Sequence, residues 1–365
     1  MPQHGGDARL LRPIHTVAGG SGLNTATHLS SLLHNFWERS DDDDTWNASL
    51  QTVINERDEY GMMISSHCSR HGFSLVNRRM TMMRDNDDGN DKSTGHCAVI
   101  VSNGDRSFMT YLGCMENFRG SHVLINDSEK FSCVDNVVHH RQHVHIAGYY
   151  NIAGFWDGEL ASKLAEIRED EAKKNEHRSK ITISLVPQQD ATEKWDGGLL
   201  ELLHYIDFLI LSEVEARNIT RYQSTATMRD TNDHTDFLQH VTEFAPFANS
   251  NTHIIVTLQS KGAVAIYDGN IVHRQTTSPE IDNPIDPTGA GDAFAAGFLY
   301  GYLSYHHRGE RGGGGDNDKE AVIDGMRWGC ATGTTSVMIQ GASVPPEKEC
   351  IERTLNCITQ HSHES

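Results

Sequence analysis

The stretch Asp282–Leu303, DNPIDPTGAGDAFAAGFLYGYL, places a glycine-rich turn directly before an apolar segment. The segment after the turn is apolar nearly all round, which predicts a buried helix. Glycines let backbone N–H groups converge in the turn, and the start of the helix adds partial positive charge, so the turn predicts an anion-binding hole. Asp292 lies at the mouth of this hole, where a bound anion would repel its carboxylate.

The residues alone leave two interpretations of Asp292 open. Its carboxylate can take a proton from a substrate hydroxyl, while the backbone amides of Gly289, Ala290 and Gly291 stabilise the charge on a transferred phosphoryl group. It can also simply cap the helix, a common function of an aspartate beside a glycine turn. From the residues alone, Asp286, at the start of the turn, is interpreted as a turn residue.

Length and charge restrict the classes of function. With 365 residues and 37% hydrophobic content, the chain can bury a full core, and we expect one α/β domain over residues 1–365. The formal net charge of −19 argues against nucleic acid or an anionic membrane as a partner. No apolar run approaches the roughly 18 residues that span a bilayer, and the first residues do not resemble a signal peptide, so we expect a cytoplasmic protein. The seven cysteines lack a C-x-x-C pair, which favours reduced thiols over disulfides or a zinc site.

Apolar, β-rich runs alternate with amphipathic segments in the second half of the chain. The runs are HVHIAGYY from His143, KITISLVP from Lys180, IDFLILSEVEA from Ile206 and HIIVTLQSKGAVAIY from His253. Buried runs of this length, separated by helical patterns, indicate repeated βαβ units. The predicted fold is therefore α/β, a doubly wound and mostly parallel sheet with helices on both faces.

Residues 94–118 differ from this pattern and predict a β-hairpin. Two strand-like runs are joined there by Asn103-Gly104-Asp105, a strong turn signal, and a hairpin in an α/β chain suggests a small β-sheet lid. Three low-complexity stretches, 38–47, 84–93 and 308–319, cannot bury apolar surface and are expected to be surface insertions in one domain.

The turn and helix at 286–303 closely resemble the C-terminal signature of the ribokinase-like, or PfkB, family of carbohydrate and nucleoside kinases. The resemblance extends from about Thr16 to Pro346. It implies a doubly wound α/β fold with a β lid, and transfer of the γ-phosphoryl group of ATP to a hydroxymethyl of a sugar or nucleoside. It also implies that Asp292 is the general base and that the amides of 289–291 form the anion hole.

AGGSGLNTATHL near the N-terminus is similar to the family's Gly-Gly-x-x-x-Asn stretch. The resemblance implies that Gly19, Gly20 and Asn24 bind the acceptor. The residues agree, because a Gly-Gly turn enters a predicted helix with Asn24 in its first turn, although Asn24 can also be only a helix cap.

Two further motifs resemble the family's nucleotide and metal sites. LSEVEA places Glu215 at the position that holds Mg²⁺ through water, with Ser212 in place of the usual asparagine beside the nucleotide. VTLQSKGA places Thr257 and Gly262 against the nucleotide, with Gln259 in place of a glycine.

The same resemblance assigns a monovalent cation, such as K⁺, to Asp286. A homodimer formed through the lid is common among relatives with β lids, and we expect it to be compatible with this chain. HHRQHVH at 139–145 looks like a metal cluster, but the neighbourhood supplies too few further ligands for zinc.

One departure from the family concerns the N-terminus. Family members begin with a core strand that ends in an acceptor-binding aspartate, whereas residues 8–18 here can supply only a lid strand. Either a segment precedes Met1, which we favour, or the strand has been lost. The rival to a kinase is therefore a catalytically impaired nucleotide- or sugar-binding protein on the same fold.

Overall fold

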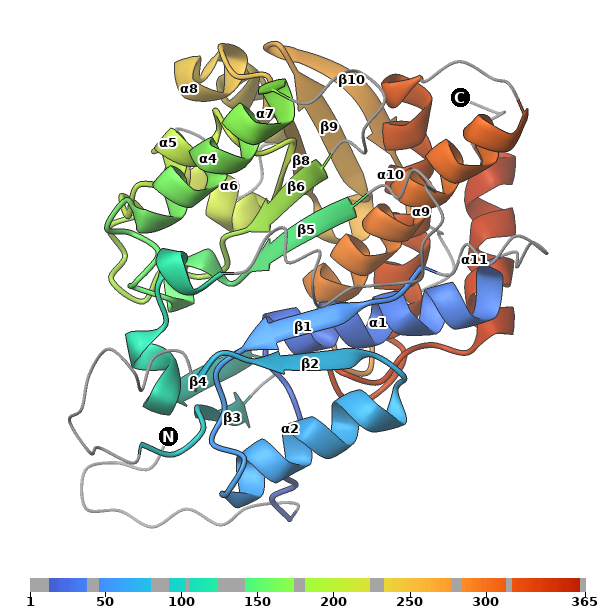
Figure 1. Ribbon diagram of the computed structural model, residues 1–365. Coiled ribbons are helices and arrows are strands. Elements are labelled where there is room, and N and C mark those ends of the chain that lie inside the picture. The colour runs from blue at the N-terminus through green and yellow to red at the C-terminus, as the bar shows by residue number, and fades with distance from the viewer. Residues whose placement is uncertain are drawn as a thin grey trace.

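The structure is a computed structural model (Figure 1), and it describes residues 13–37, 46–79, 92–102, 105–123, 142–173, 181–223, 233–277, 284–312 and 317–361.

A six-stranded sheet forms the centre of the main body (Figure 1). Along the sheet, the strands are β5 (Gln142–Ala147), β6 (Ile181–Val186), β7 (Phe208–Ser212), β8 (His253–Thr257), β9 (Ala263–Tyr267) and β10 (Asn270–Gln275). Strands β5 to β8 are parallel, while β9 and β10 pair antiparallel to their neighbours. The four predicted apolar runs form strands, and the α/β fold class is confirmed.

Alternate residues of the strands point to opposite faces and form two hydrophobic clusters. On β7, for example, Leu209 and Leu211 belong to one cluster, and Phe208 and Ile210 belong to the other. The first face is covered by α4 (Glu159–Lys173), α5 (Leu199–Leu202), α6 (Glu213–Ile219), α7 (Asp233–Glu243) and α8 (Ala245–Ala248). The second is covered by α1 (Ser21–Phe36), α9 (Ala290–Gly312), α10 (Asp318–Ser336) and α11 (Lys348–His361).

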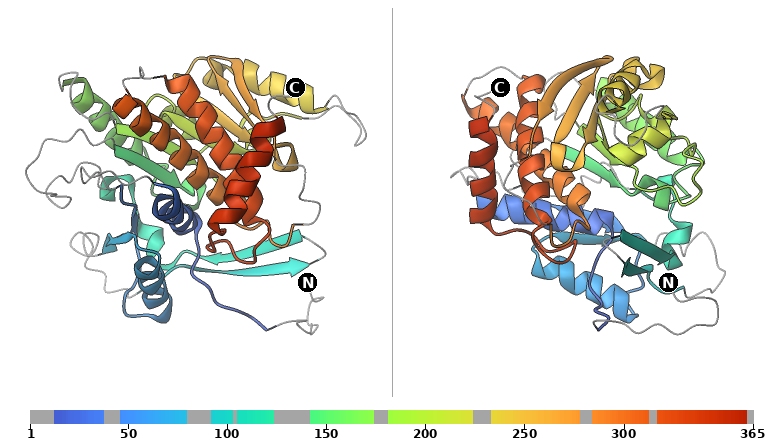
Figure 2. Two further views of the ribbon diagram at one scale, coloured as in Figure 1. Left: turned by 90° about the vertical axis from the view of Figure 1, so that its right-hand side faces the viewer. Right: turned by 180° about the vertical axis from the view of Figure 1, so that it is seen from behind.

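A smaller group of elements lies below the main sheet in Figure 1. It contains a two-stranded parallel sheet, β1 (Ser49–Thr52) and β2 (Ser74–Asn77), and α2 (Glu59–Arg70) connects the two strands in the sequence. It also contains the predicted hairpin, β3 (His96–Ser102) and β4 (Asp105–Tyr111), which extends away from the main body in Figure 2. Short 3₁₀ turns follow at η1 (Gly113–Asn117) and η2 (Gly120–His122), and later at η3 (Tyr149–Asn151) and η4 (Gln259–Lys261).

The prediction of a lid strand at 8–18 is wrong for residues 13–18, the part of this range that the structure describes. Residues 13–20 form no strand, and 8–12 lie outside the described residues. The apolar side chains of Ile14 and Val17 are exposed rather than packed on a neighbouring strand. Pro13 has no backbone N–H to donate, which further disfavours strand pairing at this point.

The low-complexity stretches are only partly described. Most of 38–47 and 84–93 lies outside the described residues. The third stretch is shorter than predicted, because residues 308–312 continue α9 and α10 begins at Asp318. In the described part of the chain, β5 is an edge strand of the main sheet, and no strand of that sheet precedes it in the sequence.

Candidate active site

Three helix starts meet near the carboxyl ends of the parallel strands. Helix α6 follows β7 directly, while the start of α1 contacts the start of α9 through side chains. Ser212 and Thr257 are paired residues at the ends of β7 and β8. Ligands of open α/β sheets bind at this edge, so the geometry directs attention to the residues predicted from the sequence.

Asp292 is the centre of the polar contacts at this edge. Its Oδ1 accepts a hydrogen bond from Ser21 Oγ at 2.7 Å, and its Oδ2 accepts one from Asn24 Nδ2 at 2.8 Å. Gln188 Nε2 approaches Oδ1 at 3.4 Å. The side chain therefore turns toward α1 instead of capping its own helix. Burial raises the pKa of Asp292 to about 6, although the three hydrogen bonds oppose the shift.

Asn24 has one free hydrogen-bonding atom. Because a carboxylate only accepts, the contact with Asp292 must use the Asn24 amide N–H, which leaves Oδ1 on the other side. Oδ1 is buried, has no partner among the described residues and faces the bare backbone of Gly19. The N-cap of α1 is Gly20, so Asn24 is not a helix cap. A buried acceptor without a donor fits a substrate hydroxyl.

The glycine turn before α9 has the shape expected of an anion hole. Gly289 has a φ of 80°, and a side chain there would collide with Ala342. The N–H of Ala290 donates to the carbonyl of Pro287 at 3.3 Å. Among the described residues, the N–H groups of Gly289 and Gly291 have no partner, and the space beside Gly291 is open.

Asp286 ties the glycine turn to the loop after α10. Its Oδ1 accepts from the N–H of Thr288 and its Oδ2 from the N–H of Gly341, both at 3.0 Å. These contacts agree with the turn interpretation of Asp286, and they also bring the 337–343 loop against the turn.

Glu215 and Ser212 form a reciprocal capping box at the start of α6. The N–H of Ser212 donates to Glu215 Oε2 at 2.7 Å, and the N–H of Glu215 donates to Ser212 Oγ at 3.3 Å. Burial raises the pKa of Glu215, and the nearby charge of Asp292 raises it further. The negative charge of Asp292 acts on the Glu215 carboxylate, and a divalent cation beside Glu215 would relieve this repulsion.

The turn after β8 brings Gly262 against another strand. Thr257 Oγ1 donates to the carbonyl of Leu211 at 3.3 Å, and the N–H of Leu258 donates to the Gly262 carbonyl at 2.7 Å. A Cβ on Gly262 would lie 1.9 Å from the carbonyl oxygen of Gln275, so the position requires glycine. Gln259 has a φ of 54°, in the left-handed region that favours glycine.

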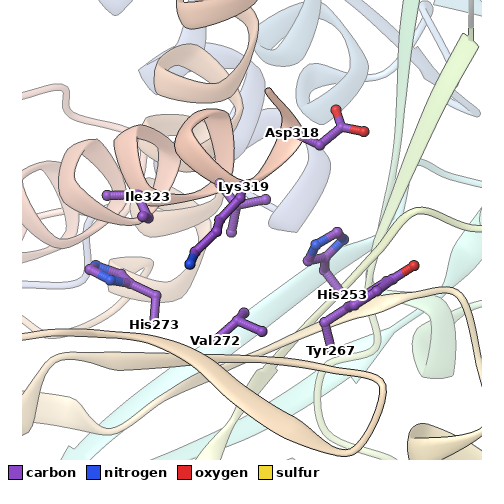
Figure 3. Close-up of a pocket in the computed structure, with 8 residues that line it drawn as sticks. His253, Tyr267, Val272, His273, Asp318, Lys319 and Ile323 are labelled. Carbon is purple, nitrogen blue, oxygen red and sulfur yellow. The ribbon is translucent and has the colours of Figure 1, made fainter. Parts of the chain in front are cut away.

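A separate pocket of about 270 Å³ lies at the opposite end of β8 (Figure 3). His253 begins β8 there, whereas Thr257 ends it at the candidate site. Lys319 of α10 points toward β10, where Val272 and His273 line the pocket (Figure 3). The two regions therefore lie at opposite ends of the strands, and the pocket is not part of the site around Asp292.

The sequence pattern of the pfkB family carbohydrate kinases matches residues 86–348. This chain belongs to that family. Among its relatives, adenosine kinase 1 of Arabidopsis thaliana is 26% identical over 209 residues, and this alignment covers 56% of this chain and 54% of that protein. The chain thus spans about half the length of the curated relatives it matches.

Solved structures of sugar kinases share the fold of this pfkB family chain. Ribokinase from Giardia lamblia superposes with a TM-score of 0.62 at 17% identity, covering 93% of this chain and 88% of that one. Arabidopsis thaliana ribokinase complexed with ribose and ATP superposes with a TM-score of 0.61 at 18% identity, covering 97% and 92%. At these identities the likeness establishes the ribokinase-like fold.

Ser21, Gln188 and His28 belong to the site but were not predicted. Ser21 directly follows the Gly-Gly pair, so its place could have been noticed. Gln188 carries no local signal, because only the folded chain brings the end of β6 to Asp292. His28 Nε2 lies 3.0 Å from the carbonyl oxygen of Ala342, which rests against Gly289, and helical periodicity cannot reveal such a contact.

Proposed function

We propose that this protein transfers the γ-phosphoryl group of ATP to a hydroxymethyl of a sugar or nucleoside. One observation carries the proposal. The buried Asp292 carboxylate lies in the first turn of α9, beside turn amides and the Asn24 Oδ1 that have no partner among the described residues, and this Oδ1 can accept from a hydroxyl. A base, an anion hole and an acceptor contact thus occur together.

In the proposed reaction, the reacting hydroxyl of the acceptor donates to Asp292, and a second hydroxyl of the acceptor donates to Asn24 Oδ1, with the backbone of Gly19 and Gly20 beside it. Asp292 takes the hydroxyl proton as the oxygen attacks the γ-phosphorus, and the bond from that phosphorus to the bridging oxygen of ADP breaks. The amides of Gly289 and Gly291 stabilise the migrating charge. The Ala290 amide can join them only if its contact with Pro287 opens.

The remaining site residues have proposed roles in holding nucleotide and cations. Thr257, Gly262 and Ser212 lie at the adjoining ends of β7, β8 and β9, where we place the nucleotide. Glu215 would hold Mg²⁺ through water, and bound Mg²⁺ would neutralise phosphate charge. Asp286 would contribute to a monovalent cation site, with K⁺ as the candidate. Because ATP is the donor, we place the activity in the cytoplasm.

A catalytically impaired binding protein is the second candidate. Three observations favour it: Ser212 stands where the family has asparagine, Gln259 stands where it has glycine, and no described strand lies beyond β5. Such a protein would bind ATP or sugar without forming ADP.

Asp292→Asn tests the base. We expect kcat to fall by roughly three orders of magnitude with ATP affinity nearly unchanged, because the neutral amide cannot accept the proton. Asp268→Asn, in an exposed turn far from the site, is the matched control. Ribose, fructose and adenosine serve as acceptors, with ADP release and calorimetric binding measured in parallel. Near-normal turnover by Asp292→Asn would remove Asp292 as the base, while binding without ADP release by the native chain would favour the second candidate.

We also propose a homodimer formed through the hairpin β3–β4. Val99, Phe108, Met109 and Tyr111 expose large apolar side chains on these two strands, an unusual density for one hairpin. Sedimentation should show a dimer that Phe108→Ser weakens and Met62→Ser, at an exposed position on α2, leaves unchanged. A monomer at all concentrations would contradict the proposal.

A further inference from the structure

Gln188 holds a backbone conformation that suits glycine better. Its φ is 60°, in the left-handed region, where the backbone of a residue that carries a Cβ is strained. It is the second residue after β6, and the two residues before it are tied to the start of η3: the N–H of Gly148 donates to the carbonyl of Val186, and that of Tyr150 donates to the carbonyl of Pro187. Such strain persists when the neighbouring structure imposes it, and it is concentrated at functional sites.

The strained backbone places the Gln188 amide between two polar groups. Its Nε2 approaches Oδ1 of Asp292 at 3.4 Å, and its Oε1 accepts from Asn151 Nδ2 at 2.9 Å. The Asp292 carboxylate is thus flanked by the amide of Asn24 on one oxygen and by that of Gln188 on the other. The contact with Asp292 is long, so it can be exchanged for a better partner at small cost.

The Asn151–Gln188 pair keeps unused hydrogen-bonding capacity beside Asp292. Each amide has a second N–H, and each carbonyl oxygen has a lone pair, with no partner among the described residues. Asn151 is exposed and Gln188 is half-buried, so a ligand can reach both. Neutral groups that donate and accept suit hydroxyls, whereas they offer no charge to recognise a carboxylate or phosphate.

We propose that Gln188, supported by Asn151, binds a ring hydroxyl of the acceptor close to the hydroxymethyl that Asp292 deprotonates. This inference rests on the proposed function and assigns the acceptor to the polyhydroxylated sugars and ribosides. Gln188 is then a specificity residue, and an acceptor that lacks the recognised hydroxyl gains nothing from it. The strain at φ 60° is the consequence of directing this side chain into the site.

Gln188→Gly distinguishes the role of the Gln188 amide in acceptor binding from its contribution to the stability of the fold. Glycine relieves the left-handed strain but adds freedom to the unfolded chain, and these effects nearly cancel, so Tm should stay within about 2 °C. Asp268→Gly is the matched control, since Asp268 has a φ of 49° in an exposed turn remote from the site. We expect Asp268→Gly to leave acceptor binding and turnover unchanged.

The acceptor probes are ribose against 2-deoxyribose, and adenosine against its 2′-deoxy and 3′-deoxy forms. For the intact compound, Gln188→Gly should lower kcat/KM by about 10- to 100-fold and weaken calorimetric binding similarly. For one deoxy form, the native chain and the variant should differ less than threefold. Equal losses for all compounds, or no loss for any, would overturn the role of Gln188.

Calorimetry without ATP keeps this test distinct from the test of phosphoryl transfer. If the native chain binds a probe but forms no ADP, the proposed activity fails and the comparison of binding constants still decides the role of Gln188. If the native chain binds none of the probes, both proposals fail together. If it phosphorylates a probe and Gln188→Gly does so equally well, only the inference about Gln188 fails.

Discussion

His28 of α1 donates from Nε2 to the carbonyl oxygen of Ala342 at 3.0 Å, across 314 positions of the chain. Burial lowers the pKa of His28 to about 4, so the ring is neutral at physiological pH and its one N–H must be on Nε2. Its Nδ1 is buried without a partner among the described residues. Ala342 in turn packs against the backbone of Gly289. The helix that carries Asn24 is therefore joined to the glycine turn at Gly289, the proposed anion hole.

This contact predicts a positioning role for His28. His28→Leu should lower kcat about tenfold with little change in KM, because the Gly289 turn loses its support from α1 while the binding residues stay in place. The lost hydrogen bond and the removed unpaired Nδ1 have opposite effects on stability, each about 1–3 kcal/mol, so Tm should change little. His28→Gln, whose amide can reach the same carbonyl, should restore most of kcat. Equal kcat in both variants would contradict this role.

The raised pKa of Asp292 predicts the pH dependence of the reaction. A general base must be ionised, and in the free protein this group titrates at a pKa of about 6. The value of kcat/KM should therefore rise about tenfold per pH unit below pH 6 and level off above it. Steady-state rates with saturating Mg²⁺ between pH 5 and 8 measure this profile. A flat profile from pH 5 to 7 would argue against Asp292 as the base.

The same pKa predicts that Asp292 destabilises the fold at neutral pH. The folded pKa of about 6 exceeds the ordinary value of 3.8, so between these values the folded chain holds a proton that the unfolded chain has released. The free energy of unfolding should thus fall as pH rises through this window, by on the order of 2–3 kcal/mol. Urea unfolding should show Asp292→Asn to be more stable than the native chain at pH 7.5, with little difference at pH 4. Equal stability at both pH values would contradict the burial of the charge.

Sequence patterns predicted the elements that local periodicity defines. The buried runs became β5 to β9, the Asn-Gly-Asp signal marks the junction of β3 and β4, with Asp105 as the first residue of β4, and the apolar segment after the glycine turn became α9. The short strands β1 and β2 were missed, because four residues with mixed polarity do not establish a period of two. The predicted lid strand at 8–18 failed at 13–18 because apolar residues without a pairing partner do not make a strand.

Site geometry was predictable only where a family motif named the residue. Asn24 and Asp292 were expected in one site, and they share a hydrogen bond. Gln188 and His28 reach the site from β6 and from the middle of α1, through contacts that span 104 and 314 positions. Nothing in their local sequence encodes these contacts, because they depend on how the helices pack against the sheet.

Glu215→Gln separates the charge of this residue from its structural role. Glutamine can accept the same hydrogen bond from the N–H of Ser212, so the capping box and α6 should be retained. The lost charge should raise the Mg²⁺ concentration for half-maximal activity about tenfold, with kcat at saturating Mg²⁺ largely kept. Glu213→Gln, in the same helical turn but paired with Arg217, is the control. An unchanged Mg²⁺ titration would leave Glu215 with a capping role alone.

Gly262→Ala should damage both the fold and the proposed nucleotide site. The added Cβ would lie 1.9 Å from the carbonyl oxygen of Gln275, and the φ of 94° is unfavourable for alanine, so β9 and β10 must separate locally. We expect a loss of about 2–4 kcal/mol of stability and weaker ATP binding. Gly72→Ala is the matched control, because Gly72 has a φ of 72° with no atom within 4 Å of the added Cβ. It carries only the conformational cost of about 1 kcal/mol. Equal losses of Tm in the two variants would show that β10 moves aside without cost, and the close approach of Gln275 would then not explain the glycine.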